Sequence, residues 1–116
     1  MFKNILRLFC MPTILVMMKH SPENCAMLHD SMRKMYVEAF NKMPELAKKH
    51  GVKLVGGWAA NSEHLMIAVY EAPTVEAYMK FANEPDMVRF IHSQDSSEMR
   101  IVQTFEEGMK VLKEAK

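Results

Sequence analysis

The chain has 116 residues, of which 49% are hydrophobic and 25% charged, a composition typical of one small folded domain. Lysine and arginine number 15 against 14 aspartates and glutamates, so neither charge accumulates, and we expect no nucleic-acid partner. The 2 cysteines show no repeated spacing, which argues against a disulfide framework and favours a reducing, cytoplasmic location.

The opening run from Met1 to Met18 is largely apolar, as in a signal peptide, but Arg7 breaks the apolar stretch and Pro12 follows it. No small-residue cleavage site follows, and the run is shorter than the roughly 20 apolar residues that cross a bilayer. We therefore expect neither a signal peptide nor a membrane partner. The chain is predicted to consist of an N-terminal appendage, residues 1–10, and a single domain, residues 11–116.

The first elements of the domain are predicted to be a strand and a long helix. Thr13 to Met18 is a continuous run of aliphatic and β-branched residues of strand length. Ser21-Pro22-Glu23 combines a capping hydroxyl, a proline at the first helical position and a first-turn carboxylate, which predicts a helix start. Apolar residues then recur at spacings of three and four as far as Met43, and Gly51 is expected to end the helix.

The middle of the chain predicts a β-hairpin followed by helices. Lys53 to Ala60 and His64 to Glu71 have strand character, and Asn61-Ser62-Glu63 separates them. Ala72-Pro73-Thr74 closes the hairpin and caps a second helix, and Pro85 restarts a short helical segment.

The last predicted elements are a fourth strand, Met99 to Gln103, and a helix opened by the capping box Thr104-Phe105-Glu106-Glu107. The order β-α-β-β-α-β with a terminal helix is that of the ferredoxin-like unit. The sequence therefore predicts an α+β fold in which two helices cover one face of a four-stranded antiparallel sheet.

The predicted strands are apolar on both faces, which favours a homodimer. Ile14, Val16 and Met18 share one face of the first strand, while Leu15 and Met17 take the other. Helices on one side leave the second apolar face open, and a second copy of the sheet is its simplest cover. The alternative is that the terminal helix folds under its own sheet.

A family resemblance rests on the element order, the two-sided strands, and the segment from His50 to Trp58, HGVKLVGGW, which leads into YEAP at Tyr70 to Pro73. Together they resemble the dimeric α/β-barrel superfamily, which includes antibiotic-monooxygenase, stress-responsive barrel and GYD-type domains. The resemblance covers Met11 to about Leu112. It implies a small-ligand pocket between sheet and helices, and some members are cofactor-free oxygenases or isomerases. No catalytic motif can be matched residue by residue.

A cluster of soft ligands is predicted at the start of the first helix. With Ser21 as the cap, His20 and Cys25 occupy the two positions that touch in a hydrophobic staple, and His29 lies one turn beyond Cys25. Two imidazoles and a thiol are ligands that zinc or copper prefers, and a thiol near a helix start has a lowered pKa. The alternative is that Cys25 is a small core residue and His29 a surface one.

The residues of the predicted hairpin indicate that one face of its two strands has space beside small side chains. An even-length loop would pair Ala59 with His64 and Gly57 with Met66, which leaves small side chains on one face and Leu54 on the other. The room would serve a ligand or, alternatively, the close approach of a partner sheet. The candidate ligand-binding residues are His20, Gly57, Ala59, His64, Met66, Ala68 and Tyr70.

Methionine accounts for 13 of the 116 residues. Its flexible side chain suits the wall of a cavity that adapts to its ligand, and the alternative is a core that simply tolerates methionine.

The leading hypothesis is a homodimeric domain that binds a small apolar or amphipathic molecule, such as an alkyl chain, between sheet and helices and without a cofactor. The first alternative is a cofactor-free oxygenase or isomerase with a pocket histidine as base. The second is a zinc or copper site, or a redox thiol, at His20, Cys25 and His29.

Overall fold

The structure is a computed structural model that describes residues 11–115, so the appendage predicted at residues 1–10 lies outside the described residues. The strands are β1 (Thr13–Lys19), β2 (Lys53–Ala60), β3 (Leu65–Glu71) and β4 (Ser96–Val102). The helices are α2 (Asp30–Lys49), α3 (Val75–Ala82), α4 (Pro85–His92) and α5 (Phe105–Glu114), with two short 3-10 turns, η1 (Pro22–Asn24) and η2 (Asn61–Glu63).

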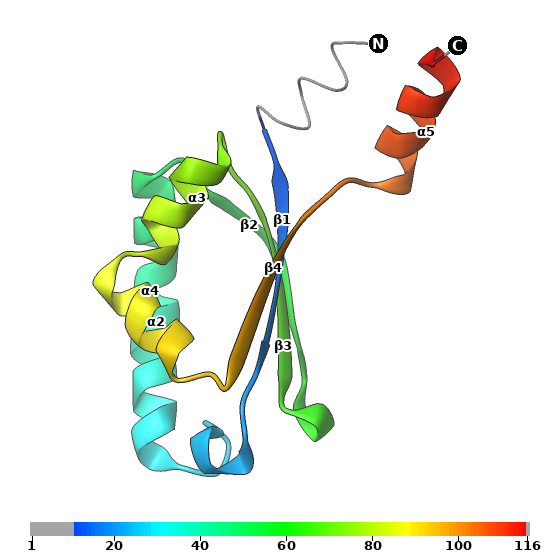
Figure 1. Cartoon of the computed structure of the whole chain (residues 1–116). Helices are drawn as coiled ribbons and strands as arrows, with labels where there is room; N and C mark the ends of the chain where they lie inside the picture. The colour runs from blue at the N-terminus through cyan, green and yellow to red at the C-terminus, as the bar shows by residue number, and fades with distance from the viewer. Residues whose placement is uncertain (1–10, 116) are drawn as a thin grey trace.

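The strands form one antiparallel sheet in the order β2-β3-β1-β4. Helices α2, α3 and α4 lie together on one side of this sheet, which we name the inner face (Figure 1). The predicted α+β, ferredoxin-like arrangement with a C-terminal helix is confirmed.

The inner face of the sheet carries the core. Every second residue of β1 is buried, at Ile14, Val16 and Met18. Tyr70 of β3 pairs with Ile14, and its ring lies 5.6 Å from that of Phe81, which is only 2% exposed. A one-residue slip of β1 would turn this row of side chains away from the helices, so the burial pattern specifies the register.

The helix ends follow local sequence signals. The side-chain oxygen of Thr74 accepts a hydrogen bond from the backbone N–H of Ala77, and that of Thr104 from Glu107, both at 3.0 Å. Gly51 follows α2 with φ 70°, the left-handed conformation that glycine adopts most easily. The predicted caps of α3 and α5 and the predicted end of α2 are therefore confirmed.

The predicted start of the first helix is wrong. Pro22–Asn24 makes a single 3-10 turn, Cys25 returns to an extended conformation with φ −82° and ψ 126°, and α2 begins only after the following loop. Arg33 of α2 holds this loop, because its guanidinium donates to the carbonyl oxygens of Ala26 and Met27 at 3.2 and 3.4 Å. Carbonyls satisfied in this way need no helical partner, and the loop is free to bury Cys25.

The hairpin forms, but its predicted register is wrong. Ala59 pairs with Met66 and not with His64, and Gly57 pairs with Ala68. The reason lies in the turn, since His64 closes η2 in the left-handed conformation and does not belong to β3.

A β-bulge in β2 changes the predicted side of one residue. The strand register shifts between Leu54 and Gly56, so that Leu54 lies opposite Tyr70 on the inner face. The prediction that Leu54 lies on the face opposite Gly57 is therefore wrong, because simple alternation along β2 does not include the bulge.

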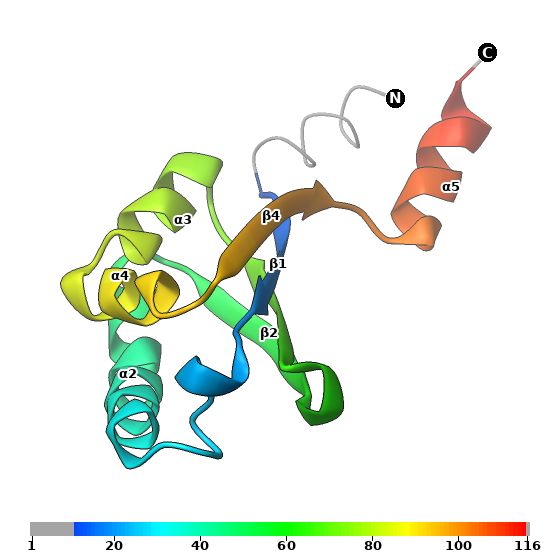
Figure 2. The ribbon, with the colours of Figure 1, turned by 60° about the horizontal axis from the view of Figure 1, so that its bottom comes forward.

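The outer face of the sheet is largely apolar across the middle of β1, β2 and β3, carries Arg100 and Glu98 on β4, and has no helix over it within residues 11–115 (Figure 2). Leu15 and Met17 of β1 lie on this face opposite Val69 and Ile67 of β3, and all four are only partly buried. Trp58 of β2, on the same face, is 62% exposed.

The terminal helix does not fold under its own sheet. Figure 1 shows α5 projecting beyond the end of β4, away from the other helices. Its apolar residues Phe105, Met109 and Leu112 are all exposed, Phe105 by 95%. In the described part of the chain, no helix has the length and hydrophobicity that crossing a membrane requires.

Candidate functional site

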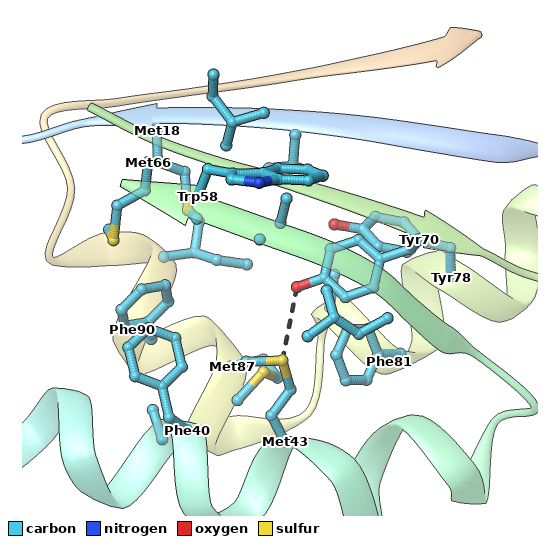
Figure 3. A pocket seen from close by; sticks show the side chains of 18 of the residues that line it. Met18, Phe40, Met43, Trp58, Met66, Tyr70, Tyr78, Phe81, Met87 and Phe90 are labelled. Carbon is cyan, nitrogen blue, oxygen red and sulfur yellow. Dashed lines mark hydrogen bonds between the residues drawn. The ribbon is translucent and has the colours of Figure 1, made fainter. Parts of the chain in front are cut away.

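A cavity of about 330 Å³ lies between the inner face of the sheet and the helix layer (Figure 3). This volume is at the lower end of the range for small-molecule sites, about 300 to 1,000 Å³. Its walls are made largely of methionines and aromatic rings from strands and helices, namely Met18, Phe40, Met43, Met66, Tyr70, Tyr78, Phe81, Met87 and Phe90.

Small residues leave room on the sheet side of the cavity. Gly57, Ala59 and Ala68 line it together with Met66. A Cβ atom added to Gly57 would meet only the backbone oxygen of Ile67, at 3.7 Å, which is an ordinary contact. No neighbouring group of this chain therefore requires a glycine at this position, and the space beside it belongs to the cavity.

Tyr70 brings a polar group into this apolar space. Its hydroxyl donates to the thioether sulfur of Met43 at 3.7 Å, a weak acceptor (Figure 3). Burial raises the pKa of Tyr70 from 10.0 to about 12, and burial also raises the pKa of Tyr78. At neutral pH the Tyr70 hydroxyl is therefore protonated and acts as a hydrogen-bond donor.

The cavity opens between α2 and β2. The exposed residues among its lining all come from these two elements, and they include Phe40 of α2 and Leu54 and Ala59 of β2. The lining residues from β1, β3, α3 and α4 are buried or partly buried. A molecule entering from solvent would pass between Phe40 and the inner side of β2.

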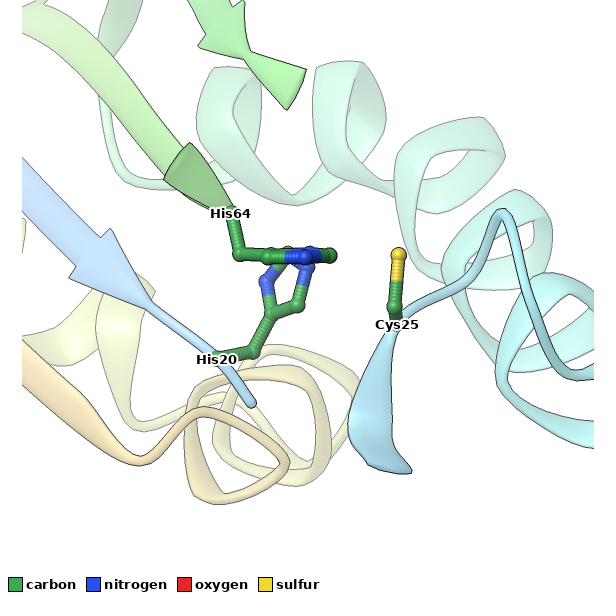
Figure 4. A group of neighbouring side chains, drawn as sticks. All are labelled: His20, Cys25 and His64. Carbon is green, nitrogen blue, oxygen red and sulfur yellow. The ribbon is translucent and has the colours of Figure 1, made fainter. Parts of the chain in front are cut away.

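Three of the four remaining candidate residues meet at a second place. Side-chain ligand atoms of His20, Cys25 and His64 all lie within 4.8 Å of one another, and we call these residues the histidine–cysteine cluster (Figure 4). His20 follows β1, Cys25 follows η1, and His64 closes the hairpin turn. The structure does not bring His29 to this cluster, because its exposed ring lies at the start of α2 and bonds to the carbonyl of Pro22 at 3.1 Å.

A buried hydrogen-bond network supports His20. Its Nδ1 lies 3.2 Å from Oε1 of Gln94, whose amide in turn donates to the hydroxyl of Tyr36 at 2.6 Å. Burial raises the pKa of Tyr36, although the hydrogen bond from Gln94 opposes this shift. Gln94 is not among the residues predicted from the sequence. The one sequence feature that indicates it is its position as a polar residue just after the amphipathic helix α4.

The cavity and the histidine–cysteine cluster are neighbours on the inner face. Met18 and Met66 pair in the sheet and line the cavity, and His20 and His64 lie two residues beyond them. The Tyr36 ring lies 4.9 Å from that of Phe90, another cavity residue.

Comparison with solved structures identifies the class of fold. A Bacteroides thetaiotaomicron protein of the antibiotic biosynthesis monooxygenase type superposes with a TM-score of 0.57 over 81% of this chain and 89% of its own, at 12% identity. A Mycobacterium tuberculosis protein gives 0.56 over 81% and 94%, at 5% identity. A NIPSNAP family protein of unknown function from Agrobacterium tumefaciens gives 0.53 over 81% and 87%, at 14% identity.

The chain therefore has the ferredoxin-like fold of antibiotic biosynthesis monooxygenase-type structures, as the sequence resemblance implied. At these identities the likeness establishes the fold, while function has to be argued from the site. No protein-family model matches the sequence, and no curated protein matches it.

Proposed function

We propose that this chain is a homodimeric domain that binds one small apolar or amphipathic molecule in the cavity between its sheet and helices. The observation that carries this proposal is the chemistry of the cavity wall. Among the described residues that line it, the hydrogen-bonding side-chain groups on the inner face are two tyrosine hydroxyls. Such a wall favours a ligand that buries hydrocarbon, at about 25 cal/mol per Å² of apolar surface removed from water.

The cavity also suggests where a polar end of the ligand would lie. The hydroxyl of Tyr70 donates to the sulfur of Met43, and an oxygen acceptor on a ligand would be a stronger partner. Methionine side chains are flexible and adapt to irregular shapes. The best-fitting ligand is therefore a mainly hydrocarbon or aromatic molecule with one carbonyl or carboxyl oxygen for Tyr70.

Proton abstraction by a cavity base has less support. Among the described residues that line the cavity there is no histidine, aspartate, glutamate or lysine. Tyr70 retains its proton at neutral pH because its pKa is about 12, so it does not supply a base either. These features favour binding over a cofactor-free oxygenase or isomerase with a pocket histidine.

Dimer formation is supported by two apolar surfaces that face solvent in the single chain. One is the outer face of the sheet around Leu15, Met17 and Trp58, and the other is the apolar side of α5 around Phe105 and Leu112. Exposed apolar surfaces of this kind are typical of association sites. A second copy that pairs the two outer faces would cover the first of these surfaces.

The binding proposal is tested by filling the cavity. Ala68→Leu places a larger side chain in the middle of the inner face, and Gly57→Leu does so near the opening. Wild type should bind an apolar fluorescent probe, and a fatty acid should displace that probe. Both variants should bind the probe at least about 10-fold more weakly while losing less than the 1 to 3 kcal/mol that overpacking a filled core costs.

Val37→Leu is the matched control, because Val37 is an exposed residue of α2 that does not line the cavity. It should bind the probe as wild type does. If wild type binds neither probe nor fatty acid, or if the leucine variants melt earlier with unchanged binding, the cavity is part of the packed core and the proposal fails.

The dimer is tested separately by sedimentation. Wild type should sediment as two chains of 13.4 kDa each at micromolar concentration. Trp58→Lys and Met17→Lys place charges on the outer face and should shift the population to monomer. A monomeric wild type would disprove the dimer without bearing on the cavity.

A further inference from the structure

We infer that His20, Cys25 and His64 form a binding site for a thiophilic d10 metal ion, Zn²⁺ or Cu⁺. This inference is independent of the cavity proposal, because none of the three residues lines the cavity. The ligand atoms lie within 4.8 Å of one another, and Cys25 is buried beside the two imidazoles. Two nitrogens and one sulfur make a ligand set that zinc and copper(I) prefer over magnesium or calcium.

His64 has an unused coordinating atom. Its Nδ1 is buried and has no hydrogen-bond partner among the described residues. Leaving a buried polar atom unsatisfied destabilises a folded protein, so native structures rarely contain one without a reason. A metal ion bound through this nitrogen would satisfy it.

The backbone of His64 supports the same reading. Its φ of 53° and ψ of 41° lie in the left-handed region, and no other described non-glycine residue has a positive φ. Glycine or asparagine would fit this turn position with less strain. Strained conformations concentrate at functional sites, and here the strained residue is also the one with the unsatisfied nitrogen.

His20 is oriented as a metal ligand usually is. Its Nδ1–H donates to Oε1 of Gln94 at 3.2 Å, which leaves Nε2 without a proton and available to coordinate. Gln94 is itself held, because its amide donates to Tyr36 and Ser93 at 2.6 and 3.0 Å. A second partner that fixes the tautomer and the ring of a ligating histidine is a regular feature of metal sites.

The geometry requires only small side-chain movements. Ligand atoms of a tetrahedral zinc site lie about 3.3 to 3.8 Å apart, given metal–nitrogen and metal–sulfur distances of about 2.0 to 2.3 Å. Side-chain rotations that move these ligand atoms by on the order of 1 Å would bring their separations into this range. The three protein ligands leave a fourth position for water or for an external ligand.

The test uses the full chain stripped of metal. Zn²⁺ is titrated in competition with a chromophoric chelator, and Cu⁺ is titrated under anaerobic conditions. Co²⁺ then serves as a spectroscopic probe, since a thiolate ligand produces a charge-transfer band in the near ultraviolet. Wild type should bind one Zn²⁺ or Cu⁺ per chain, and the Co²⁺ form should show the thiolate band.

Variants of the ligands should separate this site from adventitious binding. His64→Gly suits the left-handed turn and should keep the fold, yet it should weaken binding at least about 100-fold, more than the loss of an outer hydrogen-bond partner does. Cys25→Ala should abolish the cobalt thiolate band. His29→Gln is the matched control, because His29 lies outside the cluster, and it should bind as wild type does.

The inference is overturned if wild type binds neither ion with one-to-one stoichiometry. It is also overturned if His64→Gly and Cys25→Ala, folded by circular dichroism, bind as tightly as wild type. Loss of binding in His29→Gln to the same extent as in His64→Gly would contradict the assignment of the ligands.

Discussion

The cavity and the histidine–cysteine cluster share the inner face of the sheet but are built differently. The cavity is enclosed by side chains of regular strands and helices, such as Met66 and Phe81, and packing holds it together. The cluster is assembled from turns and loops, and hydrogen bonds through Gln94 and the left-handed backbone of His64 hold it together.

This difference shows where the fold carries local strain. The described cavity residues sit in ordinary strand and helix conformations, whereas the cluster contains a strained backbone position and an unsatisfied nitrogen, both at His64. Violations of local rules are expected mainly at functional sites. The cluster is therefore expected to carry a binding role that the stability of the fold does not need.

Truncating the cavity wall should have the largest effect. Phe81→Ala removes a ring that is 2% exposed and packs against Tyr70 and Tyr78, and it should lower the free energy of unfolding by about 3 to 5 kcal/mol. Met79→Ala on the same helix is the control, since Met79 is exposed, and it should change the value by less than about 0.5 kcal/mol. Urea denaturation measures both, and equal effects would contradict a wall held by packing.

Removing the hydrogen bonds of Gln94 to His20 and Tyr36 should have an intermediate effect on the free energy of unfolding. Gln94→Leu leaves His20 and Tyr36 without their amide partner and should lower the free energy of unfolding by about 1 to 3 kcal/mol. Gln103→Leu, at an exposed position, should have little effect. A neutral Gln94→Leu variant would show that the network does not stabilise the fold.

Relieving the strain of the cluster should stabilise the metal-free protein. His64→Gly removes a left-handed non-glycine residue and an unsatisfied buried nitrogen, so the free energy of unfolding should rise by about 1 kcal/mol. Ala60→Gly, in the same hairpin but at φ −94°, should instead destabilise by about 0.5 to 1 kcal/mol. Thermal denaturation compares them, and a destabilised His64→Gly would contradict the strain argument.

Replacing the cavity hydroxyl should have the smallest effect at neutral pH. Tyr70→Phe loses only a weak bond to Met43, so the free energy of unfolding should change by less than about 0.5 kcal/mol. The unfolded tyrosine ionises near its ordinary pKa of 10.0, while the folded one holds its proton until about 12. The stability of wild type should therefore fall between pH 10 and pH 12, and Tyr70→Phe should lose less over this interval.

Urea midpoints at pH 8 and pH 11 for wild type and Tyr70→Phe provide this measurement. Tyr36→Phe is the comparison at the cluster, because its hydroxyl accepts from the buried Gln94, and it should already destabilise at neutral pH. Equal pH dependence in wild type and Tyr70→Phe would mean that the Tyr70 hydroxyl is not buried as the structure has it.

Much of the cavity region could be predicted from the sequence. The alternating residues of β1, the small residues at Gly57 and Ala68, and the threonine caps all follow from periods and capping patterns that span a few residues. The sequence therefore predicted the element order, the inner face, and Gly57, Ala59, Met66, Ala68 and Tyr70 as residues of that face. Whether they bind a ligand stays a prediction.

The cluster depended on the tertiary structure. His20 and Gln94 are separated by 74 positions in the chain, and His64 reaches Cys25 only because η2 ends in a left-handed turn and the loop after η1 leaves the helical path. The sequence pattern predicted His29, and not His64, as the third metal ligand, because a helix was expected to start at Pro22. Local propensity determined the strands, the caps and the apolar faces of this protein. Loop conformation and contacts between distant segments decided which polar side chains meet, because those contacts form only when the whole sheet and its helices are assembled.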